Sequence, residues 1–243
     1  MEFRSEGAMA TLSGYLQFWK ERGETDARAR ETRPAFTIAI SRQSGARGTT
    51  TARAVGERLG WAVYDRELVE RIAQDIKLQA SLLEEVDEKK VGWLQEFMQS
   101  FSSAPSVSDV AYVHRMLKTI GALVERGDCV LVGRGIAHIL PVKTTLRVRV
   151  VAPVAWRVAA MSRKLGVSEK DAAVKVATID RQRIQFVREH FNKDTTDPSL
   201  YDLVLNAERF SVEQCVDLIV EALHRLQAAA AGNLTTVRPG SPS

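Results

Sequence analysis

The residues with the clearest chemical potential lie in a polar loop, residues 41–48, which reads SRQSGARG and is called the glycine loop below. A short apolar run precedes it, and a helical pattern follows, with Ala52, Val55 and Leu59 on one face. The free N–H groups at the start of a helix, together with the helix dipole, favour negative charge. The loop is therefore a candidate phosphate site. The alternative is an ordinary strand-to-helix turn without a ligand.

The glycine loop departs from the phosphate-binding pattern G-x-x-x-x-G-K-[ST]. With Gly45 as the fixed point, the two glycines of the pattern fall on Arg42 and Arg47, and its lysine falls on Gly48. Either arginine can supply the missing positive charge, although a forked guanidinium differs in geometry from an ammonium group. Arg47, inside the loop, is our preferred candidate, and a surface arginine without a ligand is the alternative.

Such a loop suits phosphoryl transfer, which needs positioning and neutralised charge more than covalent chemistry. Thr49 and Thr50 carry hydroxyls where a phosphate-bound Mg²⁺ is expected. The residues predicted to hold the donor phosphates are Ser44, Gly45, Ala46, Arg47, Gly48, Thr49 and Thr50.

Two further candidate groups follow other predicted strands. Asp65 and Arg66 end the second apolar segment, and Arg134 lies between two glycines after the apolar residues 130–132. Ligands of open α/β sheets bind at the carboxyl ends of the strands, and arginines there can bind an acceptor phosphate bidentately. We predict that Arg42 belongs to this acceptor-binding group. The alternatives are that Asp65 caps the next helix and that Arg134 pairs with it.

An arginine-rich helix supplies the last candidate group. Arg181 and Arg188 are seven residues apart and share a helical face, whereas Arg183 lies off it. Because a loose stretch follows, residues 180–199 are predicted to form a lid that brings guanidinium groups onto the transferred phosphoryl, with Asp180 and Arg188 near the acceptor. A solvated basic helix is the alternative. The predicted catalytic arginines are Arg47, Arg134, Arg181 and Arg183.

The elements that position these residues alternate along the chain. A strand, a loop and a helix repeat about five times, which predicts an α/β fold with a mostly parallel sheet covered on both faces. Residues 1–34 are predicted to be an extension or linker, residues 35–227 one domain, and residues 228–243 a disordered tail. Within the domain, the acidic residues 79–110 are predicted to be a helical insertion.

Composition limits the class of protein. The 243-residue chain has 45% apolar and 26% charged residues, as in soluble globular proteins. Its formal charge of +4 suits a small anionic ligand better than extended nucleic acid. Cys129 and Cys215 are predicted to be buried free thiols. No apolar run approaches the roughly 20 residues that span a bilayer. We expect a cytoplasmic protein without a membrane partner, and monomer and homodimer are equally compatible with the sequence.

Five motifs occur in an order that resembles the cytidylate kinase-like family, a branch of the P-loop nucleoside monophosphate kinases. The resemblance extends over residues 36–226. The motifs are IAISRQSG at 38–45, YDRE at 64–67, VGRG at 132–135 with IL at 139–140, DRQR at 180–183 and YDLVLN at 201–206.

The resemblance implies a P-loop NTPase-like, three-layer α/β/α fold with a helical insertion and a lid. It also implies transfer of the γ-phosphate of ATP to CMP or dCMP with Mg²⁺, and an acceptor-binding role for residues 79–110. The chain departs from cytidylate kinases at Gly48, where they carry lysine, and at Gly135, where they carry aspartate. Two alternatives stay open: a kinase of another small-molecule acceptor, or a catalytically degenerate nucleotide-binding regulatory protein.

Overall fold

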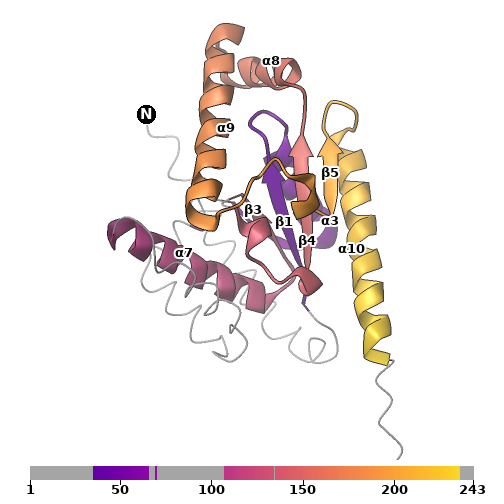
Figure 1. Ribbon diagram of the computed structural model, residues 1–243. Helices are drawn as coiled ribbons and strands as arrows, with labels where there is room; N and C mark the ends of the chain where they lie inside the picture. The colour runs from indigo at the N-terminus through magenta and orange to yellow at the C-terminus, as the bar shows by residue number, and fades with distance from the viewer. Residues whose placement is uncertain (1–34, 66–68, 70–106, 134, 236–243) are drawn as a thin grey trace, which may run out of the picture. The chain divides into compact units, whose positions relative to one another are not determined.

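A computed structural model describes residues 35–65, 69, 107–133 and 135–235. The chain divides into two units, Met1–Ala35 and Phe36–Ser243. Every helix and strand described below belongs to the second unit (Figure 1). Several predictions from the sequence fall outside the described residues. They concern the extension at 1–34, nearly all of the insertion at 79–110, and the side chains of Arg66 and Arg134.

Five strands form one parallel sheet in the order β2-β3-β1-β4-β5, as the alternation of apolar runs and helices predicted. The central strands are nearly continuous apolar runs because helices exclude water from both of their faces. The strands are β1 (Thr37–Arg42), β2 (Ala62–Tyr64), β3 (Cys129–Val132), β4 (Thr145–Val151) and β5 (Leu203–Asn206).

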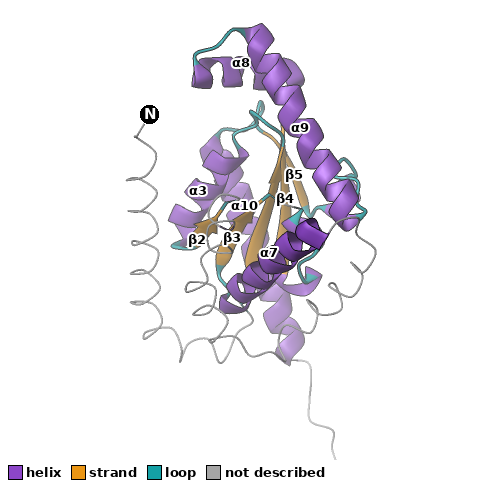
Figure 2. Cartoon of the chain, turned by 90° about the vertical axis from the view of Figure 1, so that its left-hand side faces the viewer, coloured by secondary structure: helices purple, strands orange, loops and turns teal. Residues whose placement is uncertain are grey.

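Helices lie on both sides of this sheet, which gives the three-layer P-loop NTPase-like fold (Figures 1 and 2). Apolar residues of α3 and α10, such as Val55 and Ile219, pack into one core with Ile38 and Val148 of the sheet. Figure 2 shows α7 on the other side of the strands. The helices are α3 (Gly48–Leu59), α7 (Val107–Arg126), α8 (Val154–Leu165), α9 (Glu169–Phe191) and α10 (Val212–Thr235).

Local signals in the sequence fix the ends of α8 and α9. Gly166 ends α8 in the left-handed conformation, with φ of 64°. The Ser168 side chain then accepts a hydrogen bond from the Asp171 N–H at 3.1 Å, so it caps α9. Both cysteines are free and buried, which confirms their expected state, and burial raises the pKa of the Cys129 thiol to about 12.

The predicted disordered tail is wrong for residues 228–235, because α10 continues to Thr235. Alanine has the highest intrinsic helix propensity, so the four alanines at 228–231 prolong the helix instead of ending it. Strand β1 is also longer than predicted. It includes Ser41 and Arg42, whose register partners on β4 are Arg149 and Val150. Among the described helices, none combines the length and the apolar character needed to cross a bilayer.

Candidate active site

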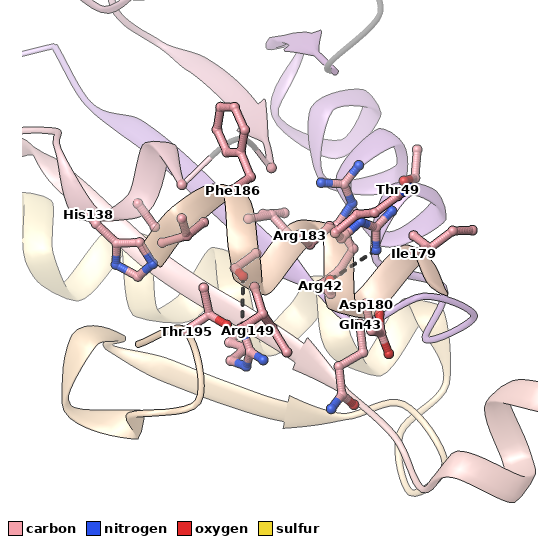
Figure 3. Close-up of a pocket in the computed structure, with 18 of the residues that line it drawn as sticks. Arg42, Gln43, Thr49, His138, Arg149, Ile179, Asp180, Arg183, Phe186 and Thr195 are labelled. Carbon is pink, nitrogen blue, oxygen red and sulfur yellow. Dashed lines mark hydrogen bonds between the residues drawn. The ribbon is translucent and has the colours of Figure 1, made fainter. Parts of the chain in front are cut away.

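A cavity of about 760 Å³ lies at the carboxyl ends of β1, β3 and β4, between the start of α3 and the second half of α9 (Figure 3). Its described lining carries four arginines and two aspartates, a formal excess of two positive charges that suits an anionic ligand. These residues are Arg42, Arg53, Arg149, Arg183, Asp65 and Asp180.

The glycine loop leads from β1 into α3 through two residues in the left-handed conformation. Gly45 has φ of 80°, and a Cβ there would stand 2.6 Å from the backbone oxygen of Arg157, so only glycine fits. Arg47 has φ of 58° and precedes the first helical residue, Gly48. The first turn of α3 leaves its N–H groups without carbonyl partners inside the helix. The start of a helix thus lies where the sequence predicted an anion site.

Two charged residues, Arg157 of α8 and Asp180 of α9, fix the glycine loop by hydrogen bonds to Ser44. The guanidinium of Arg157, a residue only 4% exposed, donates to the Ser44 carbonyl at 3.0 Å and to the Asp180 carboxylate at 2.6 Å. The other Asp180 oxygen accepts the Ser44 N–H at 2.7 Å. Asp180, predicted to lie near the acceptor, lines the cavity, but both of its oxygens are engaged by this clamp. We call Ser44, Arg157 and Asp180 the loop clamp.

Arg42 occupies the space that a lysine at position 48 would need. A Cβ built on Gly48 would clash with the Arg42 Cβ and would lie 2.9 Å from its Cγ. Farther along, the Arg42 guanidinium lies against Gly133, where a Cβ would stand 3.0 Å from Cζ. Gly133 has φ of 85°, and Arg183 donates a hydrogen bond to the Arg42 carbonyl at 3.2 Å. Compared with the usual pattern, Arg42 stands at the position of the first glycine and Gly48 at the position of the lysine. The missing side chain of Gly48 leaves the space that the Arg42 side chain fills.

The structure places Arg47 away from the cavity. Its side chain is exposed, and its guanidinium carbon lies 4.9 Å from the ring centroid of Trp156 on α8. Our preference for Arg47 as the substitute for lysine therefore has no geometric support, and Arg42 is the loop arginine that lines the cavity. The spacing in the sequence does not tell which of the two side chains folds inward.

The predicted lid arginines separate in the structure, which gives no geometric support to a catalytic role of Arg181 or to an acceptor-binding role of Arg188. Arg183 lines the cavity, whereas Arg181 and Arg188 are exposed on α9 and are not part of the lining. Thr49 lines the cavity and Thr50 is exposed outside it. Asp65 also lines the cavity, with its carboxylate 3.7 Å from the Arg53 guanidinium. Arg66 and Arg134 lie outside the described residues.

Sequence reasoning missed a second group of polar residues in the cavity wall. Arg149, 8% exposed on β4, donates hydrogen bonds from Nη1 to Ser41 Oγ at 3.1 Å and to Tyr201 Oη at 3.0 Å. Tyr201 Oη in turn donates to the carbonyl of Thr195 at 3.1 Å. His138 Nε2 lies 3.4 Å from the same Oη. The available signal was a charged residue within a strand that is otherwise buried.

His138 is a neutral member of this group. Burial, followed by the positive charges of Arg149, Lys193 and Arg147, lowers its pKa from 6.5 to about 4. Its Nδ1 is buried and has no hydrogen-bond partner among the described residues. At neutral pH, His138 therefore adds no charge to the cavity.

A magnesium ion fits the cavity only with few protein ligands. Within the described part of the chain, no three His, Cys, Asp or Glu side chains are grouped to hold a metal. Mg²⁺ commonly takes one or two carboxylates and completes its shell with water and substrate phosphates. The Thr49 hydroxyl and the Asp65 carboxylate are the oxygen ligands that the lining offers for this purpose.

Comparison with known proteins bears on the fold and the family. The chain is 24% identical over 202 residues to a cytidylate kinase of Methanopyrus kandleri, covering 79% of this chain and 95% of that protein. It is 37% identical over 97 residues to a uronate isomerase of Corynebacterium glutamicum, which is 40% of this chain and only 19% of that protein. The crystal structure of an uncharacterised protein from Eubacterium ventriosum has the same fold. Its TM-score is 0.64 at 22% identity, covering 79% of this chain and 99% of that one.

A sequence profile described as the cytidylate kinase-like family matches residues 37–209 of the chain. The matched segment includes the glycine loop, the loop clamp and the cavity described above. Because it covers well over half of the sequence, the chain belongs to the cytidylate kinase-like family.

Proposed function

We propose that this protein transfers the γ-phosphoryl group of ATP to a nucleoside monophosphate, with CMP or dCMP as the leading acceptor. One observation carries the proposal. Three arginines from separate elements, Arg42 of β1, Arg149 of β4 and Arg183 of α9, line one cavity beside the start of α3. Stabilising a transferred phosphoryl requires this convergence of fixed positive charge.

On the donor side, the N–H groups of the glycine loop and of the first turn of α3 bind the ATP phosphates. Arg42 supplies the charge that the lysine of other P-loops provides, reaching the site from the end of β1. Thr49 and Asp65 would hold Mg²⁺, which neutralises phosphate charge when bound. Arg183 lines the cavity next to Arg42, whose carbonyl accepts its hydrogen bond, and is our proposed lid arginine.

The choice of CMP or dCMP rests on family membership and on the relative from Methanopyrus kandleri, whose name gives that activity. The formal excess of positive charge in the cavity lining favours an acceptor that carries a phosphate. Another small phosphorylated or hydroxylated acceptor on the same fold is the second enzymatic candidate. We propose the cytoplasm, where ATP and nucleotides are available, and either a monomer or a homodimer.

A nucleotide-binding regulatory protein is the candidate from a different class, and the absence of lysine at Gly48 favours it. A turnover assay distinguishes the enzymatic candidates from the regulatory one. The purified protein, with ATP and Mg²⁺, is assayed against a panel of monophosphates and small alcohols. We expect phosphorylation of CMP or dCMP. Binding of ATP without turnover on any acceptor would contradict both enzymatic proposals and support the regulatory one.

Two pairs of variants test the assignment of arginines. We expect Arg183→Ala to lower kcat by about tenfold or more, equivalent to about 1.4 kcal/mol of barrier. The matched control Arg181→Ala, from the exposed face of the same helix, stays within about twofold of the parent. Likewise, Arg42→Ala weakens ATP binding and Arg47→Ala does not. If Arg47→Ala has the larger effect on ATP affinity, our assignment of the loop cation is wrong.

A further inference from the structure

Arg149 is a buried cation whose hydrogen-bond partners are neutral hydroxyl groups. It is 8% exposed, and its hydrogen bonds run to the hydroxyls of Ser41 and Tyr201. Its guanidinium carbon lies 5.3 Å from the centroid of the Tyr201 ring. Among the residues that the structure describes, no carboxylate lies within ion-pairing distance of Arg149.

The arginine two residues earlier on the same strand provides a contrast. Arg147 forms a two-pronged ion pair with Asp202, with distances of 3.2 Å from Nε and 2.7 Å from Nη2. Arg157, the other buried arginine of the site, is paired with Asp180. Buried charges in proteins are normally paired in this way because an unpaired one is costly to remove from water. Of these three arginines, Arg149 is the one without a carboxylate partner among the described residues.

The neighbours of Arg149 do not neutralise it. His138 is uncharged at neutral pH, and Thr195 and Tyr201 offer neutral oxygens. Hydrogen bonds from Thr196, and to a lesser degree the charges of Arg188 and Arg149, lower the pKa of Asp194. Its carboxylate is exposed, however, and is engaged by Thr196. Because Arg149 nevertheless lines the cavity, a ligand that enters can reach it.

We infer that Arg149 forms, with the hydroxyl of Ser41, a subsite that binds the phosphate monoester of the acceptor. A guanidinium can bind two phosphate oxygens at once. His138, a neutral ring whose Nε2 lies 3.4 Å from Tyr201 Oη, borders this subsite without adding charge. In Figure 3, His138 and Thr195 lie well apart from Thr49 at the start of α3, so this subsite and the donor site occupy different parts of the cavity.

The inference rests on the proposed function only in naming the ligand as the acceptor, because the oxyanion site itself requires no ATP. A buried arginine without a carboxylate partner at position 149 is not what stability alone would favour. An isosteric apolar residue would fill the same space without a buried charge, and such replacements are often neutral or stabilising. An arginine in this environment is what a binding role, rather than a packing role, predicts.

The test measures binding by calorimetry with the full-length protein and no ATP. The probes are CMP, cytidine, glucose 6-phosphate and glucuronate at one fixed ionic strength. The variants are Arg149→Met, Arg149→Lys and the matched control Arg147→Met. We expect the parent protein to bind CMP at least about tenfold more tightly than cytidine. Arg149→Met should abolish that preference, Arg149→Lys should retain part of it, and Arg147→Met should keep all of it.

Thermal unfolding of the ligand-free proteins separates binding from a structural role. We expect Arg149→Met to unfold at a temperature equal to or above that of the parent, and the stabilisation of the parent by CMP to be lost in the variant. A large loss of stability in both Arg149 variants without ligand would overturn the inference, as would undiminished preference for CMP in Arg149→Met. Comparable binding of glucose 6-phosphate and glucuronate would overturn the assignment to a phosphate monoester. Failure of CMP turnover in a protein that shows the expected binding pattern would contradict the kinase proposal alone.

Discussion

At the scale of single residues, the site depends on an exchange between Arg42 and Gly48. The Arg42 stem crosses the face where a Gly48 side chain would begin, and its guanidinium continues against Gly133. The two positions are thus coupled by space: arginine at 42 requires glycine at 48, whereas the usual pattern has glycine first and lysine second. A P-loop search that treats the positions independently misses this pairing.

The coupling predicts a non-additive effect on stability. We expect Gly48→Ala to lower the free energy of unfolding by about 1–3 kcal/mol, because the new Cβ overlaps Arg42 in a packed region. In an Arg42→Gly background the same change should cost distinctly less. Urea unfolding of the parent, both single variants and the double variant measures the interaction. Equal costs in the two backgrounds would show that the clash with Arg42 is not the cause.

At the scale of elements, α8 and α9 act together as a support for the glycine loop. The two helices pack through Val158, Ala172 and Val176. The loop clamp then connects this pair to the loop, through Arg157 of α8 and Asp180 of α9. The same helix that supports the loop also brings Arg183 into the cavity. A movement of α9 would therefore change the loop and the lid arginine together.

The clamp predicts a large effect for a single carboxylate. Asp180→Ala leaves the Arg157 guanidinium buried without its counter-charge and removes the acceptor for the Ser44 N–H. We expect a loss of about 3–5 kcal/mol of unfolding free energy, measured by denaturant titration. Glu221→Ala serves as the control, since it removes an exposed pair with Arg225 on α10 and should cost less than about 1 kcal/mol. Similar losses in the two variants would refute the clamp.

At the scale of the whole molecule, the parallel sheet brings polar side chains from distant parts of the sequence together at the carboxyl ends of its strands. Four side chains from separate stretches of chain meet there: Arg149 bonds Ser41 and Tyr201, and Tyr201 lies within hydrogen-bonding range of His138. Positive charges accumulate there without a matching number of carboxylates. The folded state therefore resists further protonation at this edge, which makes global stability depend on pH.

His138 gives this dependence a defined window. Its pKa is about 4 in the folded protein and 6.5 when exposed, so between these values the unfolded chain binds the proton and the folded protein does not. The contribution of His138 to stability is fully present above pH 6.5 and is lost as the pH falls towards 4. We expect the unfolding midpoint in urea to fall more steeply from pH 7 to pH 5 in the parent than in His138→Gln. Parallel pH profiles would contradict the low pKa.

The sequence by itself determined the elements, because their signals are local. The order of strands and helices, the cap at Ser168 and the stop at Gly166 depend on neighbouring residues alone. The helical phase that separated Arg183 from Arg181 and Arg188 is equally local. The candidate phosphate site at the start of α3 followed from the turn between β1 and that helix.

Tertiary structure alone decided which arginines face the cavity. Arg47 and Arg42 both flank the glycine loop, and only the left-handed turn at Arg47 and the open space beside Gly48 direct one outward and the other inward. The role of Asp180 depended on Arg157, which is 23 residues away along the chain. The partners of Arg149 come from β1 and from the chain just before β5, far from it in sequence. Side-chain direction and charge pairing are long-range properties, and no local pattern contains them.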